Sequence, residues 1–104
     1  MKEYKRLVRN MSKLVLANEP NTLEYLFYFD RVEAKCVVHE IYSNSEAVFA
    51  HNNGLASKTL LPKIFSLSRI SKFEVYGKPS KKLQRILKKF NSEIYYPFTG
   101  FSRL

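Results

Sequence analysis

The chain of 104 residues has no Trp, a single Cys and only three Gly. Cys36 cannot form an intramolecular disulfide, and so few glycines argue against a Gly-rich phosphate-binding loop. No apolar run approaches the ~20 residues that a membrane span needs. No signal peptide precedes the charged start MKEYKR. We therefore expect one domain, residues 1–104, in the reducing cytoplasm and without a membrane span.

Acidic residues are also scarce, with nine Asp or Glu against 18 Lys or Arg and a net charge of +9. The excess lies in two segments: residues 1–17 carry five basic residues and one acid, and residues 78–89 carry six and no acid. Both segments are predicted helices, so the default interpretation is a pair of solvated basic faces. A surface for RNA, DNA or a membrane is the sharper alternative.

Apolar spacing predicts the elements of the N-terminal half. A helix over residues 3–17 follows from one apolar stripe: Tyr4, Leu7, Val8, Met11, Leu14 and Val15. Pro20 disfavours its continuation. Residues 23–30 alternate as a strand, with Leu23, Tyr25, Phe27 and Phe29 on one face. After a short hairpin at 31–33, residues 34–42 form the partner strand, whose one face carries Cys36, Val38, Glu40 and Tyr42.

The remaining elements are predicted from caps and breakers. Ser43 or Ser45 can cap the next helix, which stops or kinks at residues 53–54. A second helical piece over 55–67 contains Pro62, where we expect a bend or a break.

A third strand is predicted over residues 70–76, followed by a turn at 77–80. The last helix has an apolar stripe of Leu83, Ile86, Leu87 and Phe90, and a short strand follows at 94–96.

This order, α-β-β-α-β-α-β, predicts an α+β fold of the ferredoxin-like sandwich type, with an antiparallel sheet whose first strand is missing or truncated. Helices on one face of such a sheet leave the other face bare. Because that face carries aromatic and aliphatic side chains, face-to-face pairing into a homodimer is expected.

Three pieces of sequence, in this order, resemble the antibiotic-biosynthesis monooxygenase (ABM) family. EPNTLEY at 19–25 is similar to the family's E-P-G-T-L-x-Y, with Asn21 at the glycine position. EIYSNSEA at 40–47, followed by His51, is similar to E-x-[WY]-x-s-x-E-A-x-x-x-H. VYGKPS at 75–80 resembles the family's return strand and turn. The chain departs from the family in its first strand, and it has no Trp and no second His after His51.

The resemblance implies a dimeric α+β barrel that binds a small aromatic molecule. The activity it implies is a monooxygenase acting on a quinol-like or other aromatic substrate without a cofactor. Some members of the family are haem-degrading, and many have no assigned reaction.

His51 and Glu40 are the candidate catalytic residues. Histidine as a residue type titrates near neutral pH, so His51 is the candidate to accept or relay a phenolic proton, while Glu40 orients it. The structural alternative has His51 bonding Glu40 or a backbone carbonyl to anchor its helix. Pocket-lining aromatic residues are the candidate substrate-binding set: Tyr25, Phe27, Tyr42 and Tyr76. Core and dimer packing explain these residues equally well.

No metal site is expected. Cys36 and His39 are ligand types, but residues three apart on a strand point to opposite faces. His39 is interpreted as a surface residue and Cys36 as a small core hydrophobe.

Two further functions remain open. One is the same dimer without turnover, acting as a small-molecule-binding protein. The other is an anion- or RNA-binding protein that uses the basic helices. Val75-Tyr76-Gly77 and residues 26–29 only partly match an RNA-recognition motif and lack its glycines, so nucleic acid is the less expected partner.

Overall fold

The computed structural model describes residues 1–103, and its chain divides into two compact units, Met1–Arg69 and the residues from Ile70 onward. Together they contain four helices and two small sheets, a small α+β fold. Within residues 1–103, no helix is long and apolar enough to cross a membrane.

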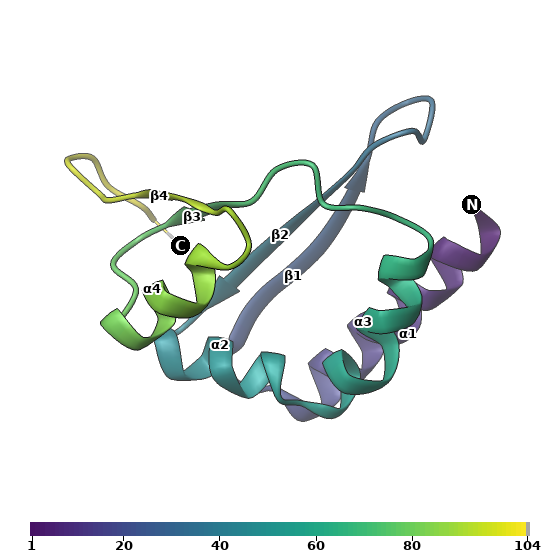
Figure 1. Ribbon diagram of the computed structural model, residues 1–104, viewed down its shortest axis with the longest axis horizontal. Helices are drawn as coiled ribbons and strands as arrows, with labels where there is room; N and C mark the ends of the chain where they lie inside the picture. The colour runs from purple at the N-terminus through teal and green to yellow at the C-terminus, as the bar shows by residue number, and fades with distance from the viewer. Residues whose placement is uncertain (104) are drawn as a thin grey trace. The chain divides into compact units, whose positions relative to one another are not determined.

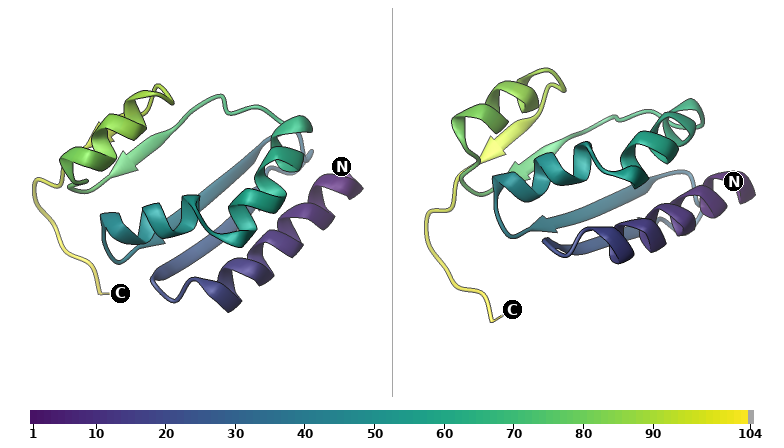
Figure 2. Two further views of the ribbon diagram at one scale, coloured as in Figure 1. Left: turned by 60° about the horizontal axis from the view of Figure 1, so that its bottom comes forward. Right: turned by 90° about the horizontal axis from the view of Figure 1, so that it is seen from below.

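The first unit packs three helices against one face of a β-hairpin. Its elements are α1 (Lys2–Asn18), β1 (Thr22–Phe29), β2 (Cys36–Tyr42), α2 (Ser45–Asn52) and α3 (Leu55–Ser66). β1 and β2 pair antiparallel, and all three helices lie on the same side of this sheet (Figures 1 and 2).

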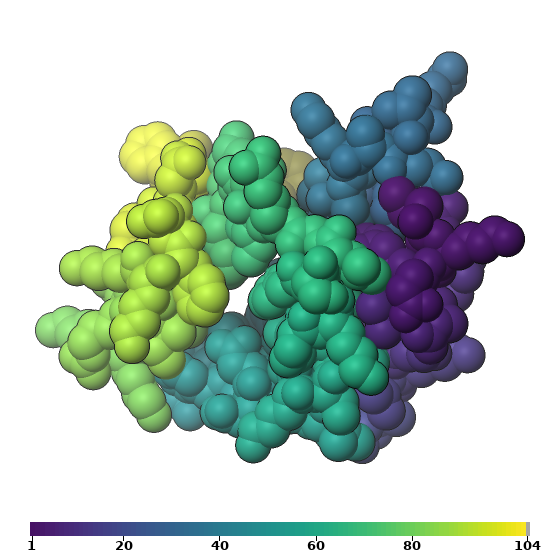
Figure 3. Space-filling view, turned by 45° about the vertical axis from the view of Figure 1, so that its right-hand side comes forward, coloured from purple at the N-terminus to yellow at the C-terminus, as the bar shows by residue number. Residues whose placement is uncertain are grey.

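The core of this unit lies between α1 and α3, which run side by side (Figure 3). The apolar stripe predicted for α1 is confirmed: Leu7, Val8, Met11 and Val15 are buried, and they meet Ala56 and Ile64 of α3. Tyr25 and Phe27 of β1 pack against this cluster. The helix layer and the inner face of the hairpin therefore share one core.

The alternation predicted for β1 holds except at its start. An irregularity between Thr22 and Glu24 adds one residue to the strand. Leu23 is 63% exposed, so its expected place on the face of Tyr25 is wrong. Such a bulge shifts every residue before it to the opposite face.

The helical connection differs from the sequence-based expectation in two details. Asn44 caps α2, because its side-chain oxygen accepts the Ala47 N–H at 2.9 Å, in place of Ser43 or Ser45. The expected stop at residues 53–54 is confirmed, since Asn53 is the C-cap of α2 and Gly54 the N-cap of α3. At Pro62, where we expected a bend or a break, α3 continues without a break. Ala56 and Ile64, on either side of Pro62, are both buried, so packing holds the helix together across the missing backbone bond.

The second unit contains β3 (Glu74–Tyr76), α4 (Lys81–Lys88) and β4 (Glu93–Tyr95). Ser80 caps α4, and the predicted stripe is buried at Leu83 and Leu87. β3 and β4 pair parallel in a sheet of their own, so the expected antiparallel sheet is wrong for these strands. Two adjacent strands joined by a helical crossover run in the same direction, which explains the pairing.

The first prediction concerns Met11, which is completely buried at the centre of the α1–α3 core. Met11→Ala should lower the free energy of unfolding by about 2–5 kcal/mol, because it removes buried apolar area and leaves a cavity. Urea denaturation followed by circular dichroism measures this. Leu16→Ala is the control on the same helix: Leu16 is 87% exposed, and its truncation should change stability by less than about 0.5 kcal/mol. Equal effects of the two changes would contradict this core.

Candidate functional site

His51 is a buried histidine on α2, with 4% of its surface exposed. Ala47 lies one turn earlier on the same face and is also buried, so this side of α2 faces the sheet. The His51 ring lies 5.4 Å from the Tyr25 ring and 5.7 Å from the Tyr42 ring, centroid to centroid. The imidazole is therefore placed between aromatic side chains of β1 and β2.

Glu19 is the hydrogen-bond partner of His51. Nδ1 of His51 lies 2.7 Å from Oε1 of Glu19, and both side chains are more than nine-tenths buried. Thr22 donates its hydroxyl to the same oxygen at 3.0 Å. A carboxylate only accepts hydrogen bonds, so the Nδ1 position carries the proton and Nε2 is left to act as a base.

The second oxygen of Glu19 is buried without a hydrogen-bond partner among the described residues. It faces Gly54, since a Cβ at that position would lie 3.2 Å from Oε2 and 3.0 Å from the Ala50 carbonyl oxygen. Gly54 is also the N-cap of α3. The positive end of the α3 dipole therefore lies beside the carboxylate and favours its negative charge.

Glu40 approaches the other side of the imidazole. Its Oε1 lies 3.6 Å from Nε2 of His51, and the Tyr42 hydroxyl donates a hydrogen bond to the same oxygen. The Glu40 side chain is 36% exposed, in contrast with buried Glu19. The three groups thus form a line from the buried Glu19 through His51 to the partly exposed Glu40.

The two tyrosines beside His51 are held in their neutral form. Burial raises the pKa of Tyr25 well above its ordinary value, and the nearby Glu40 charge raises it further. The pKa of Tyr42 is raised by the same two causes and by its hydrogen bond to Glu40. At neutral pH both hydroxyls are hydrogen-bond donors and neither is a base.

This arrangement is suited to moving a proton. A neutral Nε2 can accept a proton from an acidic group of a bound molecule, and Glu19 stabilises the resulting imidazolium through Nδ1. Glu40 provides a second, more exposed carboxylate for exchange with solvent.

The structure brings together most of the residues proposed from the sequence. His51, Glu40, Tyr25 and Tyr42 are in contact or near contact, and Phe27 joins them through an edge-to-face contact with Tyr25 at 5.2 Å. Tyr76 belongs to the second unit, where it is 73% exposed and stacks on Tyr95. The structure therefore does not place Tyr76 with the other candidates.

Sequence reasoning missed Glu19 as a site residue, although a signal was present. Glu19 follows the last turn of α1, and its N–H bonds the Val15 carbonyl. A carboxylate is unfavourable at the negative end of a helix dipole. An acid at the C-terminus of a predicted helix, directly before a proline, could therefore have marked Glu19 as a candidate site residue.

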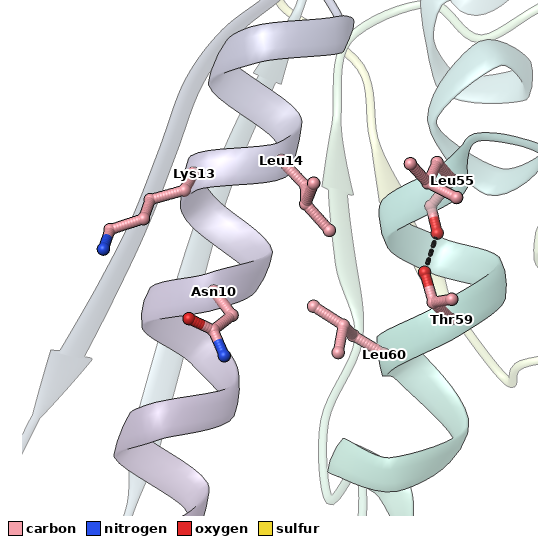
Figure 4. A pocket seen from close by; sticks show the side chains of 6 residues that line it. All are labelled: Asn10, Lys13, Leu14, Leu55, Thr59 and Leu60. Carbon is pink, nitrogen blue, oxygen red and sulfur yellow. Dashed lines mark hydrogen bonds between the residues drawn. The ribbon is translucent and has the colours of Figure 1, made fainter.

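A concave surface lies elsewhere on the first unit. A groove of about 450 Å³ runs between α1 and α3, and it is lined by Asn10, Lys13, Leu14, Leu55, Thr59 and Leu60 (Figure 4). Its Thr59 hydroxyl is bonded to the Leu55 carbonyl, and Lys13 points away from the two central leucines. None of the candidate site residues lines this groove.

No cluster of three or more His, Cys, Asp or Glu side chains that could bind a metal ion is present within residues 1–103.

No family model and no curated protein matches the chain. Among solved structures, the fold is similar to the crystal structure of MupZ from Pseudomonas fluorescens, with a TM-score of 0.73 and 24% sequence identity. The match covers 96% of this chain and 77% of the MupZ chain. At this identity the likeness supports the fold and carries no function.

The second prediction tests the space beside Glu19. Gly54→Ala should destabilise the protein by about 1–3 kcal/mol, because the new Cβ is forced against Glu19 Oε2 and the Ala50 carbonyl. The φ of Gly54 is −78°, which alanine adopts freely, so the cost is steric. A double-mutant cycle with Glu19→Ala measures the Glu19 share by urea denaturation. Strictly additive effects would show that Gly54 and Glu19 do not interact.

Proposed function

We propose that the chain is a cofactor-independent monooxygenase of the ABM type, acting on a quinol-like or other aromatic small molecule. The observation that supports it is the buried Glu19–His51 pair at 2.7 Å, placed beside Tyr25 and Tyr42. These residues include parts of the sequence pieces that resemble the ABM family.

In the proposed reaction, Nε2 of His51 removes a proton from a phenolic hydroxyl of the substrate. The phenolate is more electron-rich than the phenol and reduces O2. One oxygen atom of O2 is added to a ring carbon as a hydroxyl group, and the other leaves as water. A quinol and O2 therefore give a hydroxyquinone and water. The substrate supplies all the electrons, and the protein supplies a base and an orienting site.

Each neighbour of His51 has a separate role in this proposal. Glu19 holds the ring and stabilises its protonated form. Tyr25 and Tyr42, both neutral, stack with a flat substrate; the Tyr25 hydroxyl donates a hydrogen bond to it, while the Tyr42 hydroxyl holds Glu40. Glu40 accepts the proton from His51 and exchanges it with solvent, since its side chain is partly exposed.

We also propose that the chain is a homodimer. The face of the hairpin turned away from the helices carries several partly exposed apolar side chains around His39. Four of its side chains are 40–54% exposed: Leu26, Tyr28, Val37 and Ile41. Tyr28 and Val37 are direct partners across the two strands, while Leu26 lies opposite His39 and Ile41 opposite Glu24. A second copy that covers this face would remove its apolar surface from water, which favours association.

The third prediction concerns catalysis. Oxygen consumption with a panel of hydroquinones should be measurable, and His51→Ala should lower kcat/KM by about 10²–10⁴-fold, the usual contribution of a general base. Glu19→Gln should lower kcat/KM and shift its pH profile, because the imidazolium loses its stabilising charge. Asn52→Ala, an exposed change beside His51, is the matched control and should leave the rate unchanged.

The other outcomes are informative. Ligand-dependent thermal stabilisation without oxygen uptake would reject the oxygenase and favour a non-catalytic binding protein of the same fold. Oxygen uptake that His51→Ala leaves intact would reject the role given to this histidine.

The fourth prediction concerns the dimer. The wild type should sediment as a dimer in analytical ultracentrifugation at micromolar concentration. Val37→Glu should convert it to a monomer, because a charge would be buried within the patch. Leu16→Glu places the same charge on the exposed side of α1 and should leave the dimer intact. A monomeric wild type would exclude this assembly.

A further inference from the structure

The second unit carries a concentrated basic surface on α4. We call it the α4 basic face, and it comprises Lys78, Lys81, Lys82, Arg85, Lys88 and Lys89, all of which are exposed. Lys78 precedes the helix; at 3.6 residues per turn, the other five side chains fall within an arc of roughly 120°, opposite Leu83 and Leu87. Long side chains of this yellow-green segment extend into solvent in the space-filling view (Figure 3).

Little negative charge balances this face. The segment from residue 70 to the C-terminus contains eight basic and two acidic residues. Of these two acids, Glu74 pairs with Lys72 at 3.4 Å, and Glu93 accepts the Tyr95 hydroxyl at 2.7 Å. Like charges one turn apart on a helix, such as Lys81 and Arg85, destabilise it. An external anion would relieve that repulsion.

The same unit also exposes aromatic side chains after β4. Phe98 is 96% exposed and Phe101 is 83% exposed, with Tyr96 nearby in sequence at 57%. The Arg103 guanidinium lies over the Phe101 ring at 4.9 Å from its centroid. Two nearly bare phenylalanines next to a cation present apolar area that a non-aqueous surface would accept.

The two features together point to one kind of anion. Single-stranded nucleic acids bind where aromatic platforms and positive charge coincide. Here the stacked pair Tyr76–Tyr95 has the carboxylates of Glu74 and Glu93 hydrogen-bonded to its hydroxyls, which repels phosphates. An anionic bilayer needs no platform. It attracts Lys and Arg to its headgroups and accepts Phe at the boundary of its acyl chains.

We propose that residues 78–103 form a docking surface for an anionic lipid bilayer, on which the protein binds peripherally. The α4 basic face supplies the electrostatic attraction, and Phe98 and Phe101 insert at the headgroup level. This surface is independent of the His51 site, so its test does not depend on any catalytic activity.

The fifth prediction is measured by sedimentation of the intact chain with vesicles. The protein should co-sediment with phosphatidylcholine vesicles containing about one-third phosphatidylserine and remain free with pure phosphatidylcholine. The triple change Lys81→Glu, Arg85→Glu and Lys88→Glu should weaken binding by at least ~100-fold, since each basic side chain contributes about fivefold near such a surface. Phe98→Ser with Phe101→Ser should weaken the binding that remains at high salt, where charge attraction is screened.

The matched control carries the same change of charge on α1: Lys2→Glu, Arg9→Glu and Lys13→Glu. It should keep most of the vesicle binding. Equal loss in both triple variants would show a net-charge effect and overturn the proposed surface, as would equal binding to neutral vesicles. Binding of single-stranded poly(U) that depends on the α4 basic face, without vesicle binding, would assign the surface to nucleic acid and also overturn the proposal. Circular dichroism establishes that each variant is folded.

Discussion

The contact between Glu19 and His51 joins the helices of the first unit where the chain enters the hairpin. Glu19 stands where α1 ends and the chain enters β1, and His51 belongs to α2. Gly54, at the start of α3, gives the carboxylate its space. One buried pair at 2.7 Å thus joins the end of α1, the body of α2 and the start of α3. A change at any of these three residues alters the environment of the other two.

Burying the Glu19–His51 pair carries a desolvation cost that opposes folding. Taking a carboxylate out of water costs several kcal/mol, and a buried ion pair often stabilises less than apolar residues of the same volume. Here one carboxylate oxygen is left without a partner among the described residues, which adds a further penalty. Leu7, Val8, Met11 and Val15 already supply an apolar core nearby. Stability alone is therefore a weak explanation of the pair, and the proton transfer proposed at Nε2 gives it a second one.

Local patterns predicted the helices and strands well, because each depends on spacing within one segment. The α1 stripe, the hairpin and the α4 stripe all follow from this. The pairing of β3 with β4 could not be predicted this way, since it depends on which strands are adjacent. In a ferredoxin-like sheet the first strand is central and lies between the hairpin and the strand that follows the next helical segment, so here it would connect β2 to β3. With no such strand among the described elements, the hairpin and the β3–β4 pair remain two sheets.

The candidate site shows the same division. His51, Glu40 and Tyr42 lie within one strand–helix segment, so a motif spanning residues 40–51 could connect them. Glu19 lies 32 residues before His51, and only the folded chain shows that they meet. Tyr76 had the right residue type, but its burial depends on tertiary packing that no local pattern encodes. Residue type can therefore nominate a proton-handling histidine, while the choice of its carboxylate partner is a property of the fold.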